Sequence, residues 1–495
     1  MKHSNEIVKT DATTIAKMVS SQEVPAREVL EAFLERISKY NDALRAFVYA
    51  DIEGARTRAS EIDREVKRGT TYRMAGVPIA VKDVISVKGL PLTCGSKILR
   101  GYVPPYDATV IARLRKAGCV IVGMTNTDEF AMGSSTENSA YGPSINPWMQ
   151  SRVPGGSSGG SAVAVAAGMA AIGLGSDTGG SVRLPASFVG VYGLKPSYGA
   201  VSRFGLVAFS NSIEQVGLFA RSIGDLKLAY SVISGADPLD GTTLTFDWNL
   251  TTEEGTKANV FRAGKVIEMS GEGVEPPVLE ALDRTVETLK RYSIQIENVN
   301  IPHLVNCLAA YYLIAMSEAS SNLARFDGVR YGSRVKTEGN WNEEYSRIRA
   351  LFGSEVKRRV ILGAHALSSG FFSMYYDKAA RFRTLIKSEF ESAFRNYDLL
   401  IGPTSPSPAF RLGERTLDPV QMYLSDVDTV PMNLTGVPAL SVPTGFANAE
   451  GGLLPVATQL IAPYGREDTI FGVASLLEKA GLSTPKVVNP WGNIL

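Results

Sequence analysis

The chain has 495 residues, of which 44% are hydrophobic and 20% charged, and its net charge at pH 7 is +1. This composition excludes a disordered or fibrous protein and allows a large buried core. The near-zero net charge argues against a broad basic surface, so any work on RNA needs a partner that supplies most of the contact. Cys94, Cys119 and Cys307 are far apart and lack CxxC spacing, which argues against a disulfide framework and a zinc site.

The N-terminus carries no export signal that we recognise. Met1 to Thr14 is polar, and no apolar run in the chain reaches the ~20 residues of a membrane span. The longest candidate, Ser161 to Gly173, is rich in Ala and Gly and predicts a packed helix followed by a strand. We therefore expect a cytoplasmic protein that does not enter a membrane.

Helical patterns predominate over residues 1–70. Asp11 is placed to cap a short helix that runs to Ser20. After Pro25, apolar residues recur at helical spacing, namely Val29, Leu30, Phe33, Leu34 and Ile37. We expect this segment to form an outer helical layer of the same domain as the rest of the chain.

Strand and helix patterns then alternate. Gly76 to Ile85 predicts a buried strand with Lys82 at its exit. Thr109 to Ala117 predicts a helix, and Cys119 to Gly123 predicts a further strand. This β-α-β order favours an α/β sheet.

Residues 133–160 are rich in Ser, Gly, Asn and Pro and have the composition of a linker. They lead directly into a helix of small residues, Ser161 to Met169, and then to a glycine-rich turn that ends in Ser181. A linker has no reason to open a helix with Gly-Gly-Ser-Ser-Gly-Gly. We therefore expect a long active-site loop.

The second half resumes the α/β pattern after a polar stretch near residues 237–255, where we expect insertions. One amphipathic helix carries Val278, Leu282, Val286 and Leu289 on a single face. The other predicted elements are strands at Lys265 to Met269, Ile294 to Val299, Leu399 to Pro403 and Ala439 to Pro443, and long helices at Arg347 to His365 and Tyr375 to Phe394.

A serine hydrolase with a histidine base is the first chemical possibility. Gly156-Ser157-Ser158-Gly159-Gly160 matches the G-x-S-x-G pattern of such enzymes. The chain has only three histidines, however: His3 lies in the N-terminal tail, and His303 and His365 have the surroundings of structural residues. Lysine is the better candidate for the base.

Lys82 is suited to that role because it follows a buried strand. A lysine acts as a base only when neutral, and desolvation lowers its reference pKa of ~10.4 toward the working range. A serine placed between this amine and a nucleophilic serine would relay the proton. The alternative is an ion pair with Asp83 or another carboxylate.

Three separated segments resemble the amidase signature family. The first is Gly-Gly-Ser-Ser-Gly-Gly-Ser around Ser157, and the second is Asp-Thr-Gly-Gly-Ser-Val-Arg, whose serine, Ser181, lies 24 positions after Ser157. The third contains Lys82, 75 positions before Ser157. The resemblance implies that Lys82 is the base, Ser157 a bridging residue after a cis peptide, and Ser181 the nucleophile. It also implies a single large mixed β-sheet flanked by helices on both faces, with residues 71–495 as the family domain and a variable segment around 237–265.

The turn before Ser181 offers backbone donors for the oxyanion that forms when a serine attacks an amide. One such donor is worth ~3 kcal/mol in the transition state. We expect an ion pair between Asp177 and Arg183 to brace this turn. The predicted donors are the N–H groups of Thr178, Gly179, Gly180 and Ser181.

Further segments, at residues 317–332, 355–359, 366–370 and 422–426, resemble the glutamine-hydrolysing components of tRNA-dependent amidotransferases. The resemblance implies an acyl-enzyme that releases ammonia from glutamine for the conversion of Glu-tRNA(Gln) to Gln-tRNA(Gln). A B subunit would use ATP and Mg to activate the glutamate and would hold most of the misacylated tRNA, and a small C subunit would help assembly. The chain itself would bind neither cofactor nor metal.

Free glutamine needs a cation for its α-carboxylate and an anion for its α-ammonium. Arg359 and Asp426, with Tyr311 nearby, match the positions that bind the amino acid in this group, and a guanidinium suits a carboxylate well. The register leaves Arg358 and Tyr312 as alternatives.

Three departures from the resemblance and two competing hypotheses remain. Asp428 stands where the resemblance implies an aromatic or aliphatic residue, which would change the local charge, and residues 237–265 and the C-terminus from Pro463 match weakly. The chain would otherwise be a free-standing amidase acting on small carboxamides, or a catalytically silent scaffold.

Overall fold

The computed structural model describes residues 2–245, 262–334 and 339–491. These residues form one mixed sheet of 11 strands in the order β1-β3-β2-β4-β6-β5-β10-β11-β9-β7-β8. The predicted fold class, an α/β protein built on a single large mixed sheet, is confirmed. The strands are β1 Phe47–Ala50, β2 Pro78–Lys82, β3 Val120–Thr125, β4 Ile172–Asp177, β5 Tyr192–Lys195, β6 Gln215–Ala220, β7 Arg262–Val266, β8 Gln295–Val299, β9 Leu399–Pro403, β10 Ala439–Ala449 and β11 Gly452–Ile461.

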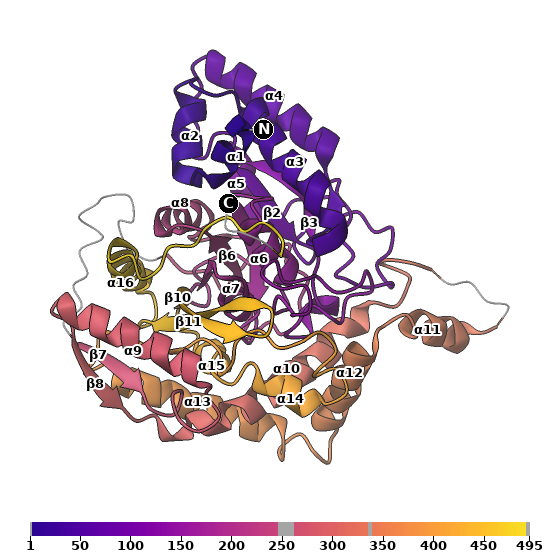
Figure 1. Cartoon of the computed structure of the whole chain (residues 1–495). Helices are drawn as coiled ribbons and strands as arrows, with labels where there is room; N and C mark the ends of the chain where they lie inside the picture. The colour runs from indigo at the N-terminus through magenta and orange to yellow at the C-terminus, as the bar shows by residue number, and fades with distance from the viewer. Residues whose placement is uncertain (1, 246–261, 335–338, 492–495) are drawn as a thin grey trace.

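Helices pack around this sheet (Figure 1). Helices α1 to α4 gather at one end of the molecule, and α10, α12 and α13 lie at the opposite end. None of the described helices is both long and apolar enough to cross a membrane. The α-helices are α1 Lys2–Lys9, α2 Ala12–Ser20, α3 Ala26–Leu44, α4 Ile52–Lys67, α5 Thr109–Lys116, α6 Gly159–Ala166, α7 Arg183–Val189, α8 Ile223–Ile233, α9 Pro276–Arg291, α10 Cys307–Asn322, α11 Trp341–Arg349, α12 Ser354–Leu367, α13 Tyr376–Ala393, α14 Pro419–Leu424, α15 Val430–Thr435 and α16 Glu467–Lys479.

The N-terminal residues form helices where the sequence predicts them. The Asp11 carboxylate caps α2 by accepting a hydrogen bond from the Thr14 N–H at 2.6 Å. Helix α3 starts directly after Pro25, which occupies the N-cap position with an extended backbone. Strand β1, from within this segment, pairs antiparallel with β3 and so joins the main sheet.

Strand β2 holds the position that matters for the site. It lies between β3 and β4 and runs parallel to both, and all of its residues are buried. Its continuous apolar pattern is typical of such a central parallel strand. Because β2 and β4 are parallel neighbours, their carboxyl ends lie next to each other. Lys82 at the end of β2 and Asp177 at the end of β4 are therefore close together.

Three element predictions need correction. The helix expected over Arg347 to His365 is two helices, α11 and α12, since Gly353 is extended and donates its N–H to Glu129 at 2.7 Å. Strand β7 begins and ends three residues before the predicted Lys265 to Met269, and β10 continues to Ala449 because it forms a hairpin with β11. Of the variable segment around 237–265, residues 246–261 lie outside the described residues.

Candidate active site

Lys82 is fully buried at the carboxyl end of β2. Its Nζ donates to Ser157 Oγ at 2.6 Å and to Ser176 Oγ at 2.9 Å. Burial lowers the pKa of the Lys82 amine to about 7, although Asp128 and Asp177 act in the opposite direction. The amine is therefore neutral in a large fraction of molecules at neutral pH, as a base must be.

Asp83, the alternative partner of Lys82, is engaged elsewhere. Its carboxylate accepts hydrogen bonds from the Thr93 N–H at 2.8 Å, from the Thr93 hydroxyl and from the Gly95 N–H at 3.2 Å. Burial raises the pKa of Asp83 to about 7. Asp83 and Lys82 therefore do not form the ion pair that sequence alone left open.

Ser157 follows a cis peptide bond from Gly156, as the family resemblance implies. A Cβ at Gly156 would lie 2.2 Å from Asp128 Oδ2, so no side chain fits there. The Asp128 carboxylate also accepts from the N–H groups of Thr136 at 2.8 Å and Asn138 at 3.0 Å. Residues 133–160 are thus packed against the segment that carries Ser157 and Ser158. This supports the interpretation of residues 133–160 as an active-site loop rather than a linker.

The turn that carries Ser181 is braced by a buried ion pair. Arg183 Nη2 lies 2.9 Å from Asp177 Oδ1, and both side chains are fully buried. Although burial opposes ionisation, the charge and hydrogen bonds of Arg183 lower the pKa of Asp177 to about 2. The guanidinium also reaches Thr429 O at 2.9 Å, Gln459 Oε1 at 2.7 Å and Asn433 Oδ1 at 2.6 Å. The predicted brace is confirmed.

Ser181 lies at the mouth of this arrangement, with 8% of its surface exposed, whereas Ser157 and Lys82 are fully buried. The Ser158 N–H donates to Ser181 O at 3.2 Å and ties the two serine segments together. A substrate therefore meets Ser181 first, and the proton acceptors lie behind it.

The predicted oxyanion donors are not equivalent. The Gly180 N–H donates to Asp177 Oδ1 at 3.0 Å, so it is not free to bind an oxyanion. Three of the four predicted oxyanion donors are left. The N–H groups of Thr178, Gly179 and Ser181 have no acceptor within the described part of the chain. A Cβ at Gly179 would lie 2.4 Å from Tyr311 Cζ, so the turn fits against that ring only as glycine.

Arg359 is the buried member of its pair of arginines. Its side chain is 2% exposed, whereas that of Arg358 is 40% exposed. Arg359 Nε donates to Glu355 Oε1 at 2.8 Å, and the guanidinium lies 5.2 Å from the ring centre of Tyr312 and 5.4 Å from that of Tyr423. Its two outer nitrogens have no hydrogen-bond partner among the residues described, which leaves them for a carboxylate.

Asp426 lies beside Tyr312, one of the aromatic residues that surround Arg359. Its Oδ2 accepts from Ser134 Oγ at 2.7 Å and from the Tyr312 hydroxyl at 3.3 Å. Burial raises the pKa of Asp426 to about 7, against the opposing effects of Ser134 and the Arg359 charge. Tyr311 packs on the nucleophile turn and Tyr312 contacts Asp426, so both tyrosines line the region.

Asp428 is buried and its Oδ2 has no hydrogen-bond partner among the described residues. Burial raises its pKa well above the usual range. Burial therefore disfavours the negative charge that Asp428 would otherwise add at a position where the resemblance implies an aromatic or aliphatic residue.

Sequence reasoning did not single out four residues that complete the site: Asp128, Ser134, Ser176 and Glu355. Ser176 carried the one usable signal, since it precedes Asp177 at the end of a strand parallel to β2. The other three gave no such signal. Asp128 and Ser134 contact partners eight and 292 positions away along the chain, and Glu355 contacts Arg359 within an amphipathic helix that has no unusual sequence pattern. Among the described residues, no three His, Cys, Asp or Glu side chains are grouped as a metal site requires.

The two histidines with described side chains do not serve the serines. His303 Nδ1 contacts Glu389 Oε1 on the surface, and the His365 ring lies 4.3 Å from that of Phe371. This agrees with the structural role that we predicted for both.

The fold and the lysine-serine arrangement agree with what the comparison with family models finds. The model described as Amidase matches residues 28–471, so the chain belongs to the amidase family. Among its relatives, the glutamyl-tRNA(Gln) amidotransferase A-subunit protein of Acidothermus cellulolyticus is 48% identical over 482 residues, 96% of this chain and 95% of the relative. That of Streptomyces coelicolor is 47% identical over 99% of this chain and 98% of the relative. The crystal structure of the corresponding A-subunit protein from Thermotoga maritima is similar with a TM-score of 0.80 at 36% identity, covering 97% of this chain and 98% of that one.

Proposed function

We propose that this chain is the glutamine-hydrolysing subunit of a tRNA-dependent amidotransferase. The observation that carries the proposal is the fully buried Lys82 amine, 2.6 Å from Ser157 Oγ and with its pKa lowered to about 7. The names of the relatives at 47–48% identity over nearly the whole chain support glutamine and tRNA as the context of that chemistry.

Acylation begins with neutral Lys82. Its Nζ takes the Ser157 hydroxyl proton while Ser157 Oγ takes the proton of Ser181 Oγ, so Ser181 attacks the side-chain carbonyl carbon of glutamine. Negative charge develops on the carbonyl oxygen, and the N–H groups of Thr178, Gly179 and Ser181 stabilise it. Lys82 becomes an ammonium in the same step.

Collapse of this intermediate breaks the carbon–nitrogen bond. The proton held on Lys82 returns through Ser157 to the amide nitrogen. Ammonia is then released, and the glutamyl group remains bound to Ser181 as an ester. Water then attacks the ester while Ser157 and Lys82 take up its proton. Protonation of Ser181 Oγ releases glutamate, so one glutamine and one water yield one glutamate and one ammonia.

The substrate ends are matched by opposite charges. The outer nitrogens of Arg359 receive the α-carboxylate, and Asp426 receives the α-ammonium. Since the pKa of Asp426 is about 7 in the free protein, a bound ammonium favours its ionised form. Tyr311 limits the space above the nucleophile turn.

Ammonia then passes to a B subunit, which uses ATP and Mg to activate glutamate on tRNA, while a small C subunit helps assembly. The net charge of +1 supports placing most tRNA contacts on the B subunit. The chain itself works without a cofactor, in the cytoplasm.

The test is ammonia release from glutamine by the purified chain, alone and with B and C subunits, tRNA and ATP. We expect stimulation by the partners and loss of activity in Ser181→Ala. Ser187→Ala, at a buried serine of α7, is the matched control and should stay active. Broad hydrolysis of simple carboxamides without stimulation would instead identify a free-standing amidase, and full activity of Ser181→Ala would remove Ser181 from the mechanism.

A further inference from the structure

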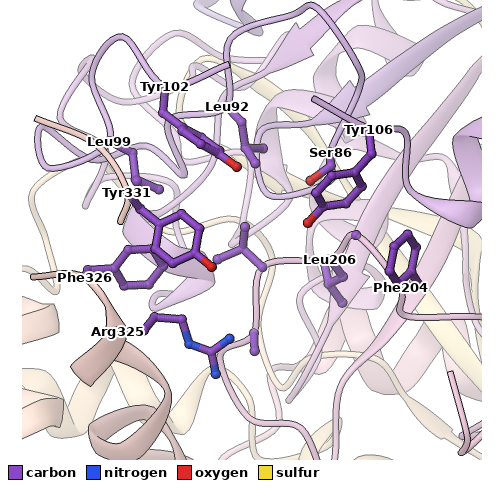
Figure 2. Close-up of a pocket in the computed structure, with 13 residues that line it drawn as sticks. Ser86, Leu92, Leu99, Tyr102, Tyr106, Phe204, Leu206, Arg325, Phe326 and Tyr331 are labelled. Atoms are coloured by element: carbon purple, nitrogen blue, oxygen red, sulfur yellow. The ribbon is translucent and has the colours of Figure 1, made fainter. Parts of the chain in front are cut away.

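A pocket of about 150 Å³ lies apart from the residues described above. It is formed by the loop after β2, the segment before Phe209 and the segment that follows α10, and it shares no lining residue with the catalytic or glutamine-binding sets. Figure 2 shows side chains from these three segments facing one another across the space. None of the steps of amide hydrolysis proposed above uses this pocket.

Four hydroxyl groups line the pocket, those of Ser86, Tyr102, Tyr106 and Tyr331. In Figure 2 the three phenol groups are directed into the space from different sides. Within the described residues, none of the four hydroxyls has a side-chain hydrogen-bond partner. Burial raises the pKa of Tyr102, so its phenol stays protonated and able to donate.

The pocket carries one positive charge and no negative one, because Arg325 is its only charged lining residue. Arg325 Nε donates to Asn322 O at 2.8 Å and Nη2 donates to Asn322 Oδ1 at 3.1 Å. These bonds hold the guanidinium and leave Nη1 for a ligand. Asp327, the nearest acid along the chain, is turned to Arg330 at 3.4 Å.

The remaining walls are apolar and aromatic, with Leu92, Leu99, Leu206 and Phe326 among them. The Tyr102 and Tyr331 rings meet edge to face at 6.0 Å, and Phe326 lies 5.9 Å from Tyr331 and 4.9 Å from Phe130 behind it. A cavity of about 150 Å³ is the size that accommodates a single benzene ring.

We propose that this pocket binds a small aromatic monocarboxylate. The guanidinium and the hydroxyl donors suit a carboxylate, while the apolar walls suit a ring-sized body. A cation is repelled by Arg325, and a polyphosphate would need more than one positive charge. The proposal does not depend on glutamine being the substrate.

Titration calorimetry of the full chain with phenylacetate tests the proposal. We expect one phenylacetate per chain, binding at least about tenfold more weakly for uncharged benzyl alcohol, and no binding of benzylamine. Arg325→Met should weaken phenylacetate about tenfold, and Tyr331→Phe should weaken it severalfold while keeping the ring. Arg330→Met is the matched control, because it removes an equal charge from a neighbouring arginine that does not line the pocket.

Three results would overturn the proposal. The first is no binding of phenylacetate, and the second is equal binding of benzyl alcohol, which would make the pocket a purely apolar one. The third is phenylacetate affinity unchanged in both Arg325→Met and Tyr331→Phe, which would place the ligand elsewhere, for example at Arg359.

Discussion

Replacement of Lys82 by arginine keeps the positive charge and removes the base. Burial lowers the pKa of this lysine from 10.5 to about 7, which raises the neutral fraction at pH 7 by roughly 10³ relative to an ordinary lysine. Arginine stays protonated in proteins, so an arginine at this position has no neutral form that could accept a proton. We expect kcat for glutamine hydrolysis in Lys82→Arg to fall by roughly 10³, within the range that a positioned base contributes.

The assay is ammonia release measured from about pH 5.5 to about pH 9, a range that brackets the Lys82 titration. In the unaltered chain, kcat should rise with pH through about 7, because activity requires the form of Lys82 that has lost its proton. Lys195 provides the control: it is also fully buried, and burial lowers its pKa to about 7 as well. Within the described residues, its Nζ donates to Pro196 O at 2.8 Å and to no serine. Lys195→Met should therefore keep the inflection. If Lys82→Arg retained activity within tenfold of normal, or if the inflection vanished in Lys195→Met alone, Lys82 would not be the base.

Three further predictions concern the turn and the substrate residues. Arg183→Met leaves a buried carboxylate unpaired and should lower the free energy of unfolding by about 3–5 kcal/mol, measured by urea denaturation; a change under about 1 kcal/mol would contradict the brace. Gly179→Ala should lower kcat at least about tenfold because its Cβ has no room, whereas Gly241→Ala, which meets nothing within 4 Å, should be neutral in the same assay. Arg359→Met should raise KM for glutamine by about a hundredfold and Arg358→Met by less than about threefold; equal effects would refute the assignment of the α-carboxylate to Arg359.

Local sequence patterns predicted much of the fold because those patterns depend on near neighbours. Strand β9 has the predicted bounds, and α2 has the predicted cap, since each is set by a proline or an aspartate within the segment itself. The break at Gly353 was beyond reach, because the acceptor that fixes it, Glu129, lies 224 positions earlier. The length of β10 likewise depends on pairing with β11.

The candidate site divides in the same way. The roles of Lys82, Ser157 and Ser181 could be predicted because their glycine-rich surroundings and their spacing resemble the amidase signature family. Ser134 carries no such mark, and it becomes part of the site only through its bond to Asp426, 292 positions away. The choice of Arg359 over Arg358 also depended on which side of α12 faces the core.

The partners of Arg183 have a consequence for how the protein is made. Three of the groups that hold this residue, Thr429, Asn433 and Gln459, are 246, 250 and 276 residues further along the chain. A ribosome therefore completes the segments with Lys82 and both serines long before it supplies the groups that fix the nucleophile turn. A nascent or truncated chain that ends before Gln459 lacks part of that support, so we expect amide hydrolysis to start only after Gln459 has been added and has folded against Arg183.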